Sequence, residues 1–201
     1  MIIDMHMHEM RYSGDSFLRL ENMVEIAKRR GLDGICITDH DSMGLKEFAA
    51  EYSEKTGFPI FVGIEFYSLQ GDIVAFGIED YPKERIPAQE FVDLVQAQGG
   101  MCFSAHPFRN NNRGLEENLK IVKGLDGIEV LNGSTLYEAN RKAAEYAAEL
   151  GLATVGSSDC HVPEKLGLYA TYFPREIRSV QELIRSVKRC ETLPVYYKEG
   201  G

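Results

Sequence analysis

The pentapeptide GLDGI occurs twice in this chain of 201 residues, at positions 31–35 and again at positions 124–128. Each copy follows a segment with helical spacing of apolar residues and leads into a short apolar run. A looser copy, GLATVG, spans residues 151–156. Glycine often follows the last residue of a helix, because it readily adopts the left-handed backbone conformation needed there. The repeat therefore marks the passage from helix to strand in an array of alternating helices and strands.

The rest of the chain continues this alternation in both directions. Short apolar runs predict strands at residues 2–7, 34–38, 59–65, 72–78, 101–105, 128–131, 153–156 and 168–173. Helical spacing predicts helices at residues 17–30, 45–56, 88–98, 115–123, 137–150 and 180–189. Strands that alternate with helices form a parallel sheet, and about seven such units favour a closed barrel. We expect an α/β fold with a single domain over residues 1–201, in which residues 192–201 form an edge strand or a frayed end.

The composition is that of an ordinary globular protein, with 44% hydrophobic and 26% charged residues. The formal net charge of −9 argues against an extended nucleic-acid surface, which needs a broad basic footprint. The four cysteines show no CxxC spacing, which predicts reduced thiols and no disulfide framework. No apolar stretch has membrane-spanning length, and the first residues do not resemble a signal peptide. We expect a cytoplasmic protein with no membrane partner, and the sequence leaves its oligomeric state open.

All five histidines lie within or directly after apolar runs. The motif DMHMH places His6 and His8 two residues apart, and SSDCH does the same for Asp159 and His161. Alternate residues of an extended strand point to the same side, so each pair shares one face and the residue between them is turned away. A single histidine of this kind is usually a hydrogen-bonded interior residue. Five of them with carboxylates nearby favour a metal site.

The polar residues of the chain concentrate at the C-terminal ends of the predicted strands. These residues are Thr38, Asp39, His40, Glu65, His106, Asn132, Asp159 and His161. In a βα-barrel the C-terminal strand ends converge on one face, where the chemistry is placed. The pattern therefore predicts that these side chains meet at a single mouth of the molecule.

Six motifs in order, DMHMH, YSGDS, ITDHD, GIE, AHP and GSSDCH, resemble those of the polymerase and histidinol phosphatase (PHP) family of metal-dependent phosphoesterases. The resemblance runs from residue 1 to about residue 173. It implies a distorted (β/α)7 barrel that holds two or three divalent metal ions. The ligands implied for the first ion are His6, His8, Glu65 and Asp159. Those implied for the second are Glu65, as a bridge, and His106, and those for the third are His40, His161 and Asp15.

The sequence departs from the family pattern in two places. The loop that carries Asp15 is slightly longer than usual. Where the family has a histidine at the start of the strand after GIE, this chain has Asp72, which is either an oxygen ligand or a solvated turn residue. An oxygen ligand there would shift the metal preference towards manganese or iron over zinc. Nitrogen and oxygen ligands without thiolate suit Mn²⁺, Fe²⁺ or Zn²⁺.

The activity implied by the resemblance is hydrolysis of a small phosphomonoester: a nucleotide, a nucleoside bisphosphate or a sugar phosphate. A hydroxide that bridges the two ions sharing Glu65 would attack phosphorus. This makes Glu65, Asp159, His161 and Arg109 the catalytic candidates.

Several further residues are candidates for supporting roles. Arg109 is the best candidate for gripping a phosphate through a bidentate fork, ahead of Arg11 and Arg113. Asn132 and Ser134 are candidates for lining the substrate pocket. Asp4 is a candidate for orienting a ligand imidazole, whereas Asp39 should point away and make a structural hydrogen bond.

Four other interpretations stay open. Two are enzymes of the same chemistry: a histidinol phosphatase, and a phosphodiesterase or nuclease acting on short oligonucleotides. The third is a metal-binding module without catalysis. The fourth is an amidohydrolase-type barrel, which also begins with HxH but typically needs a metal-bridging lysine, and no lysine ends a predicted strand at a suitable place.

Overall fold

The first sheet gathers strands from both ends of the chain. The computed structural model describes residues 1–196, and in this part the sheet has the order β10-β9-β1-β2-β3. Its strands are β1 (Ile2–Asp4), β2 (Gly34–Ile37), β3 (Ile60–Val62), β9 (Tyr169–Tyr172) and β10 (Leu193–Tyr196). The β1–β2 and β2–β3 pairs are parallel, whereas β9 runs antiparallel to both β1 and β10. The predicted edge strand near the C-terminus is present as β10, and residues 197–201 of that prediction lie outside the described residues.

The second sheet consists of five strands that are consecutive in the chain, in the order β4-β5-β6-β7-β8. They are β4 (Ile64–Tyr67), β5 (Asp72–Phe76), β6 (Met101–Ser104), β7 (Gly127–Asn132) and β8 (Ala153–Ser157). The β4–β5 and β5–β6 pairs are antiparallel, and the β6–β7 and β7–β8 pairs are parallel.

Five of the six predicted helices are α-helices. They are α1 (Leu20–Arg29), α2 (Lys46–Thr56), α3 (Ala88–Ala97), α4 (Tyr137–Leu150) and α5 (Val180–Lys188). The helix predicted at residues 115–123 is instead a short 3₁₀ helix, η1 (Glu116–Lys120). Glu116, the first residue of η1, has a φ of 49°, outside the right-handed helical region, so the segment does not begin as a regular α-helix.

The prediction of a closed (β/α)7 barrel is wrong: the fold is mixed α/β, with two sheets that do not close on each other. The run 59–65, predicted as one strand, divides at Gly63 into β3 of the first sheet and β4 of the second. No helix separates β4 from β5, so these strands form an antiparallel hairpin in place of a parallel βα unit. Between the sheets the described residues make only two isolated bridges, Met7–Cys160 and His40–Glu65.

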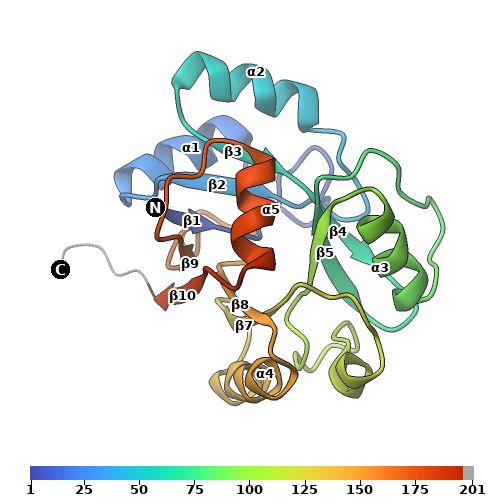
Figure 1. Ribbon diagram of the computed structural model, residues 1–201. Helices are drawn as coiled ribbons and strands as arrows, with labels where there is room; N and C mark the ends of the chain where they lie inside the picture. Colours follow the sequence, from blue (N-terminus) through green and yellow to red (C-terminus); the bar gives the residue numbers. More distant parts are fainter. Residues whose placement is uncertain (197–201) are drawn as a thin grey trace.

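Most strands other than β9 and β10 are buried on both faces, which explains their continuous apolar runs. Alternate residues of β5 show this, since Val74 and Phe76 pack into the core between the sheets while Ile73 and Ala75 pack outward. Figure 1 shows α1 and α2 beside the first sheet and α3 beside β4 and β5, with α4 next to β7 and β8. Helix α5 packs Leu183 into the central core. Among the described residues no helix has the length and apolar character needed to cross a membrane.

We expect the Gly63→Ala substitution to destabilise the protein by about 1–3 kcal/mol, because it overpacks the junction of the two sheets. A Cβ atom at Gly63 would lie 2.4 Å from the backbone oxygen of Ala75. Urea unfolding followed by circular dichroism measures the change. Gly14→Ala is the matched control, because a Cβ at Gly14 meets no atom within 4 Å. Equal stability of the two variants would contradict this account of the junction.

Candidate metal centre

Glu65 in β4 lies at the centre of the site, with its side chain almost fully buried. Four of the five histidines lie around its carboxylate. Glu65 Oε2 is 2.7 Å from His40 Nδ1, and Glu65 Oε1 is 2.9 Å from His106 Nε2. His6 Nε2 and His8 Nε2 follow at 3.3 Å and 3.6 Å. One carboxylate therefore joins side chains from the ends of β1, β2, β4 and β6.

His6 and His8 lie on the extended chain just after β1, and their Nε2 atoms are 3.0 Å apart. The other ring nitrogen of each histidine, Nδ1, has a hydrogen-bond partner of its own. His6 Nδ1 is 3.2 Å from Glu129 Oε1, and His8 Nδ1 is 3.2 Å from the Ser13 hydroxyl. Such partners orient the ring, so that both Nε2 atoms are directed at the same point.

Asp159 closes this inner group from the end of β8. Its Oδ1 is 3.2 Å from His8 Nε2 and 3.6 Å from His6 Nε2. Both Asp159 and His106 have positive φ values, 50° and 27°, which residues other than glycine rarely adopt. Backbone strain of this kind clusters at functional sites, where the surrounding structure holds it in place.

A second, more exposed group lies at the rim. Asp15 Oδ2 is 3.3 Å from His40 Nε2 and 3.4 Å from His161 Nε2. The His8 ring lies between these two imidazoles, with ring centroids 4.2 Å from each. The longer loop after β1 thus carries Asp15 to the place that the sequence prediction requires.

Two arginines from the loop after β6 contact ligand carboxylates. Arg109 donates from Nη2 to Asp159 and to Asn132 Oδ1, the latter at 2.7 Å. Arg113 binds both oxygens of Asp72, from Nε at 2.6 Å and from Nη2 at 2.9 Å. Asp72 is also 3.7 Å from His106 Nε2, so it belongs to the cluster but shares its oxygens with a guanidinium.

Close backbone packing fixes the loop that carries both arginines. A Cβ at Gly114 would lie 2.0 Å from the Pro107 carbonyl oxygen, and a Cβ at Gly71 would lie 2.6 Å from the Gly114 carbonyl carbon. In addition, the Asp72 amide donates to the Arg113 carbonyl at 2.7 Å. The turn between β4 and β5 therefore sets the position of the arginine loop.

The charges of the cluster compensate one another. Burial alone would raise the pKa of Glu65, but the surrounding imidazoles, His6 first, hold it well below its usual range. Burial likewise opposes the charge of His6, yet Asp159 and Glu65 raise its pKa well above the usual value. His8 differs, because burial dominates and lowers its pKa to about 4. The neighbouring carboxylates therefore outweigh burial at His6, whereas burial outweighs them at His8.

The donor set fits divalent cations. Four groups of three residues place their potential ligand atoms within 4.8 Å of one another: His8, His40, His161; His6, His106, Asp159; His6, His8, Glu65; and Glu65, Asp72, His106. All donors are nitrogen or carboxylate oxygen, and Cys160 packs into a hydrophobic cluster away from the site. Such donors suit Mn²⁺, Fe²⁺ or Zn²⁺.

The sequence analysis missed Glu129, which is fully buried in β7. Besides His6 it contacts the His106 amide at 2.7 Å, Asn132 Nδ2 at 2.9 Å and the Ser157 hydroxyl. The orienting role suggested for Asp4 is wrong, because Asp4 accepts hydrogen bonds from the Ser158 amide and the Gly167 amide. The signal for Glu129 was present as a lone carboxylate inside the apolar strand IEVL.

The other residues with predicted supporting roles include Asp39, Asn132 and Arg11. The expectation for Asp39 is confirmed, since its Oδ1 accepts from the Glu9 amide at 2.6 Å and from the Ser13 hydroxyl at 2.8 Å. Asn132 is fully buried and does not line the pocket; it holds Arg109 and Asp159 in place. Arg11 pairs with Glu21 outside the pocket.

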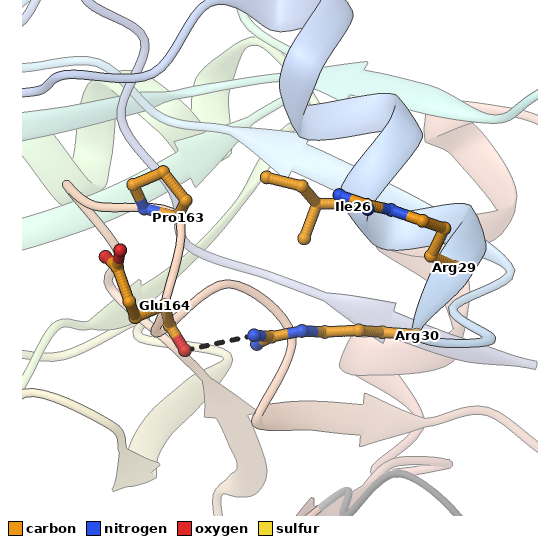
Figure 2. Close-up of a pocket in the computed structure, with 5 residues that line it drawn as sticks. All are labelled: Ile26, Arg29, Arg30, Pro163 and Glu164. Carbon is orange, nitrogen blue, oxygen red and sulfur yellow. Dashed lines mark hydrogen bonds between the residues drawn. The ribbon is translucent and has the colours of Figure 1, made fainter.

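The segment that follows His161 is held from the outside of the fold. Arg30, at the end of α1, donates to the carbonyl oxygen of Leu166 and, at 3.2 Å, to that of Glu164. This guanidinium borders a cavity of about 310 Å³. Figure 2 shows it directed at the Glu164 carbonyl oxygen, with Pro163 beside Glu164 on one side of the cavity and Ile26 on α1 with Arg30 on the other. None of the cluster residues lines this cavity. The hydrogen bonds of Arg30 anchor the segment that follows the site.

Comparison with known proteins gives one family match and several relatives. A family model described as PHP-associated matches residues 137–192. A protein of Caldicellulosiruptor saccharolyticus named probable phosphatase is 24% identical over 209 aligned positions, covering 99% of this chain and 78% of that protein.

Solved structures share the fold. A two-domain protein of Bacteroides vulgatus, described as containing a predicted PHP-like metal-dependent phosphoesterase, superposes with a TM-score of 0.77 at 23% identity. The match covers 98% of this chain and 64% of that one, so this chain spans slightly less than two thirds of the length of its relative. The lesion-specific endonuclease EndoQ of Pyrococcus furiosus superposes with a TM-score of 0.73 at 17% identity, over 94% of this chain and 56% of that one. These matches show that the chain shares its fold with proteins described as PHP-like, and that its C-terminal part is similar to a PHP-associated family.

Proposed function

We propose that this protein is a metal-dependent phosphoesterase that hydrolyses a small phosphomonoester at the cluster around Glu65. The observation that carries the proposal is the convergence of the nine residues that the sequence singles out as metal ligands. They come from seven separate places in the chain, between His6 and His161, and they enclose one small volume. Nitrogen and oxygen donors that lie this close together are suited to binding several divalent cations.

The residues divide naturally between an inner and an outer group. His6, His8, Glu65 and Asp159 would hold one ion, with His106 and Glu65 on the adjacent side for a second. His40, His161 and Asp15 would hold a third at the rim. When bound, such ions polarise the phosphoryl oxygens and lower the pKa of a nucleophilic water.

The chain's own groups bind and orient the ester. A pocket of about 180 Å³ opens over the cluster and is lined by Arg109, Arg113 and Asn111 besides the ligands. The Arg109 side chain is fixed by Asn132 and by Thr135, whose hydroxyl accepts from Nε at 3.0 Å. Since Nε and Nη2 already have partners in Thr135, Asn132 and Asp159, Nη1 is the nitrogen through which Arg109 would bind a phosphoryl oxygen. Preorganised charge is the main source of rate in phosphoryl transfer.

Cleavage of a phosphodiester is the alternative, favoured by the fold shared with the endonuclease EndoQ. Two observations favour a small monoester. The net charge of −9 gives a polyanion little attraction, and the pocket of about 180 Å³ over the cluster matches a single phosphoryl group. A histidinol phosphatase would use the same cluster with a different leaving group. A non-catalytic module would have no need for all nine residues.

We expect the His106→Ala and Asp159→Ala variants to lose phosphatase activity while they remain folded. Loss of the partners that merely orient metal ligands costs about 10–100-fold, so loss of a direct ligand should cost more than about 100-fold. Phosphate release from a panel of monoesters with added Mn²⁺ measures activity, mass spectrometry of the protein solution measures bound metal, and circular dichroism checks the fold. Excess chelator should abolish the activity of the unmodified protein.

Asp93→Ala is the matched control, because Asp93 is an exposed carboxylate on α3 that does not line the pocket over the cluster. It should keep both metal content and activity. Full activity of either ligand variant, or of the unmodified protein in chelator, would refute the proposed function.

We also expect metal uptake to release protons at about pH 7. Burial lowers the pKa of His40, but the hydrogen bond and charge of Glu65 outweigh it and raise the pKa to about 9. Below this pH the ring is protonated, and a cation that binds the neutral ring must displace the proton, so the apparent metal affinity rises with pH up to about pH 9. Titration calorimetry in two buffers with different ionisation heats counts the protons. His40→Gln should release fewer, and identical heats in both buffers would contradict the protonated cluster.

A further inference from the structure

A second, larger cavity adjoins the pocket over the cluster. It has a volume of about 700 Å³, against about 180 Å³ for the pocket, and Arg109 lines both. On the side of the cluster, Arg109 donates from Nη2 to Asp159, and on the side of the larger cavity its Nε donates to Thr135. The guanidinium thus stands at the boundary of two spaces, one of phosphoryl size and one in the size range of small-molecule sites.

The wall of the larger cavity is amphipathic. Its apolar part consists of Phe108, Leu136 and Ala139, and Leu136 is 79% exposed although it is a large apolar residue. Its hydrogen-bonding part includes Ser134 and Thr135. The Ser134 hydroxyl lies 3.1 Å from the backbone oxygen of Asp159, so this part of the wall is continuous with the cluster.

The cations that line the cavity are already paired, and one further cation lies beside it, with Lys165 Nζ 3.3 Å from the Ser134 hydroxyl. Within residues 1–196, both cations that line it already have anionic partners: Arg109 pairs with Asp159, and Lys142 Nζ is 3.2 Å from Glu117. Lys142 also lies over the Phe108 ring, 4.1 Å from its centroid. The lining also contains Asn110 and two carboxylates, Glu116 and Glu138, of which Glu138 pairs with Arg141 at 3.1 Å. Carboxylates accept hydrogen bonds from hydroxyl and amino groups and repel phosphate.

We propose that the larger cavity binds the alcohol part of the substrate, and that this alcohol is uncharged, rich in hydroxyl groups and of nucleoside size. The proposal rests on the proposed function and names its substrate class: phosphomonoesters of neutral alcohols such as nucleosides, in preference to bisphosphates and oligonucleotides. The phosphoryl group occupies the pocket over the cluster, with Arg109 beside the ester oxygen. The apolar wall contacts the body of the alcohol, and Ser134, Thr135 and the carboxylates bind its hydroxyl groups.

Filling the cavity tests the proposal. Ala139 is half-buried on the first turns of α4 and lines the cavity, so Ala139→Phe places a ring inside it. We expect KM for adenosine 5′-monophosphate to rise by about tenfold or more, while kcat/KM for glycerol phosphate changes by less than about twofold. Ala148→Phe is the matched control, because it makes the same change on an exposed face of the same helix. Metal content should be unchanged in both variants.

Two further measurements keep this inference separate from the proposed function. Adenosine itself should bind the metal-loaded protein and the Ala148→Phe variant but not Ala139→Phe, by titration calorimetry, whether or not any ester is hydrolysed. Adenosine 3′,5′-bisphosphate should be a poorer substrate than the monophosphate. Equal adenosine binding by the two variants, no adenosine binding by the unmodified protein, or a preference for the bisphosphate would overturn the inference. A lack of phosphate release from every ester would overturn the proposed function alone.

Discussion

The structure depends on the compensation of one buried negative charge, that of Glu65. An ionised carboxylate without solvent is costly unless opposite charges and donors surround it. Four imidazoles do so here: two lie after β1, one after β2 and one after β6. One of the two isolated bridges between the sheets among the described residues is His40–Glu65, so this cluster joins the sheets at the mouth of the molecule. A buried core that contains residues of both sheets holds them together elsewhere.

The order of helices and strands could be read from the sequence because apolar spacing and glycine positions are local signals. Helix α4 occupies the predicted residues 137–150, and the two GLDGI copies do lead into β2 and β7. The sheet topology could not be read in the same way. Gly63 interrupts an apolar run without any change of pattern, and only the close approach of Ala75 and Phe76 explains why the chain passes there from one sheet to the other. A sequence pattern also says nothing about whether two sheets close.

Most candidate ligands were predictable because they follow the ends of strands, where parallel strands bring side chains together, as His40, His106 and Asp159 do. The groups behind them were harder to find. Glu129 orients His6 from within β7, and Asn132 fixes Arg109 and Asp159 from a fully buried position. Their roles follow from pairings between distant segments, which a single sequence does not encode locally. For the same reason the sequence did not predict that Arg113 binds both oxygens of Asp72, which was a candidate metal ligand from its position alone.

The contacts between the two sheets extend well beyond the mouth of the molecule, and this has a consequence for how the site can change. Ile3 and Phe61 of the first sheet pack in one buried core with Phe76 and Phe103 of the second. In addition, the Thr171 hydroxyl in β9 donates to the Gly156 carbonyl oxygen in β8 at 2.7 Å and accepts from the Gly156 amide at 2.9 Å. The exchange of a single donor at the mouth therefore alters the chemistry of the site while the scaffold persists.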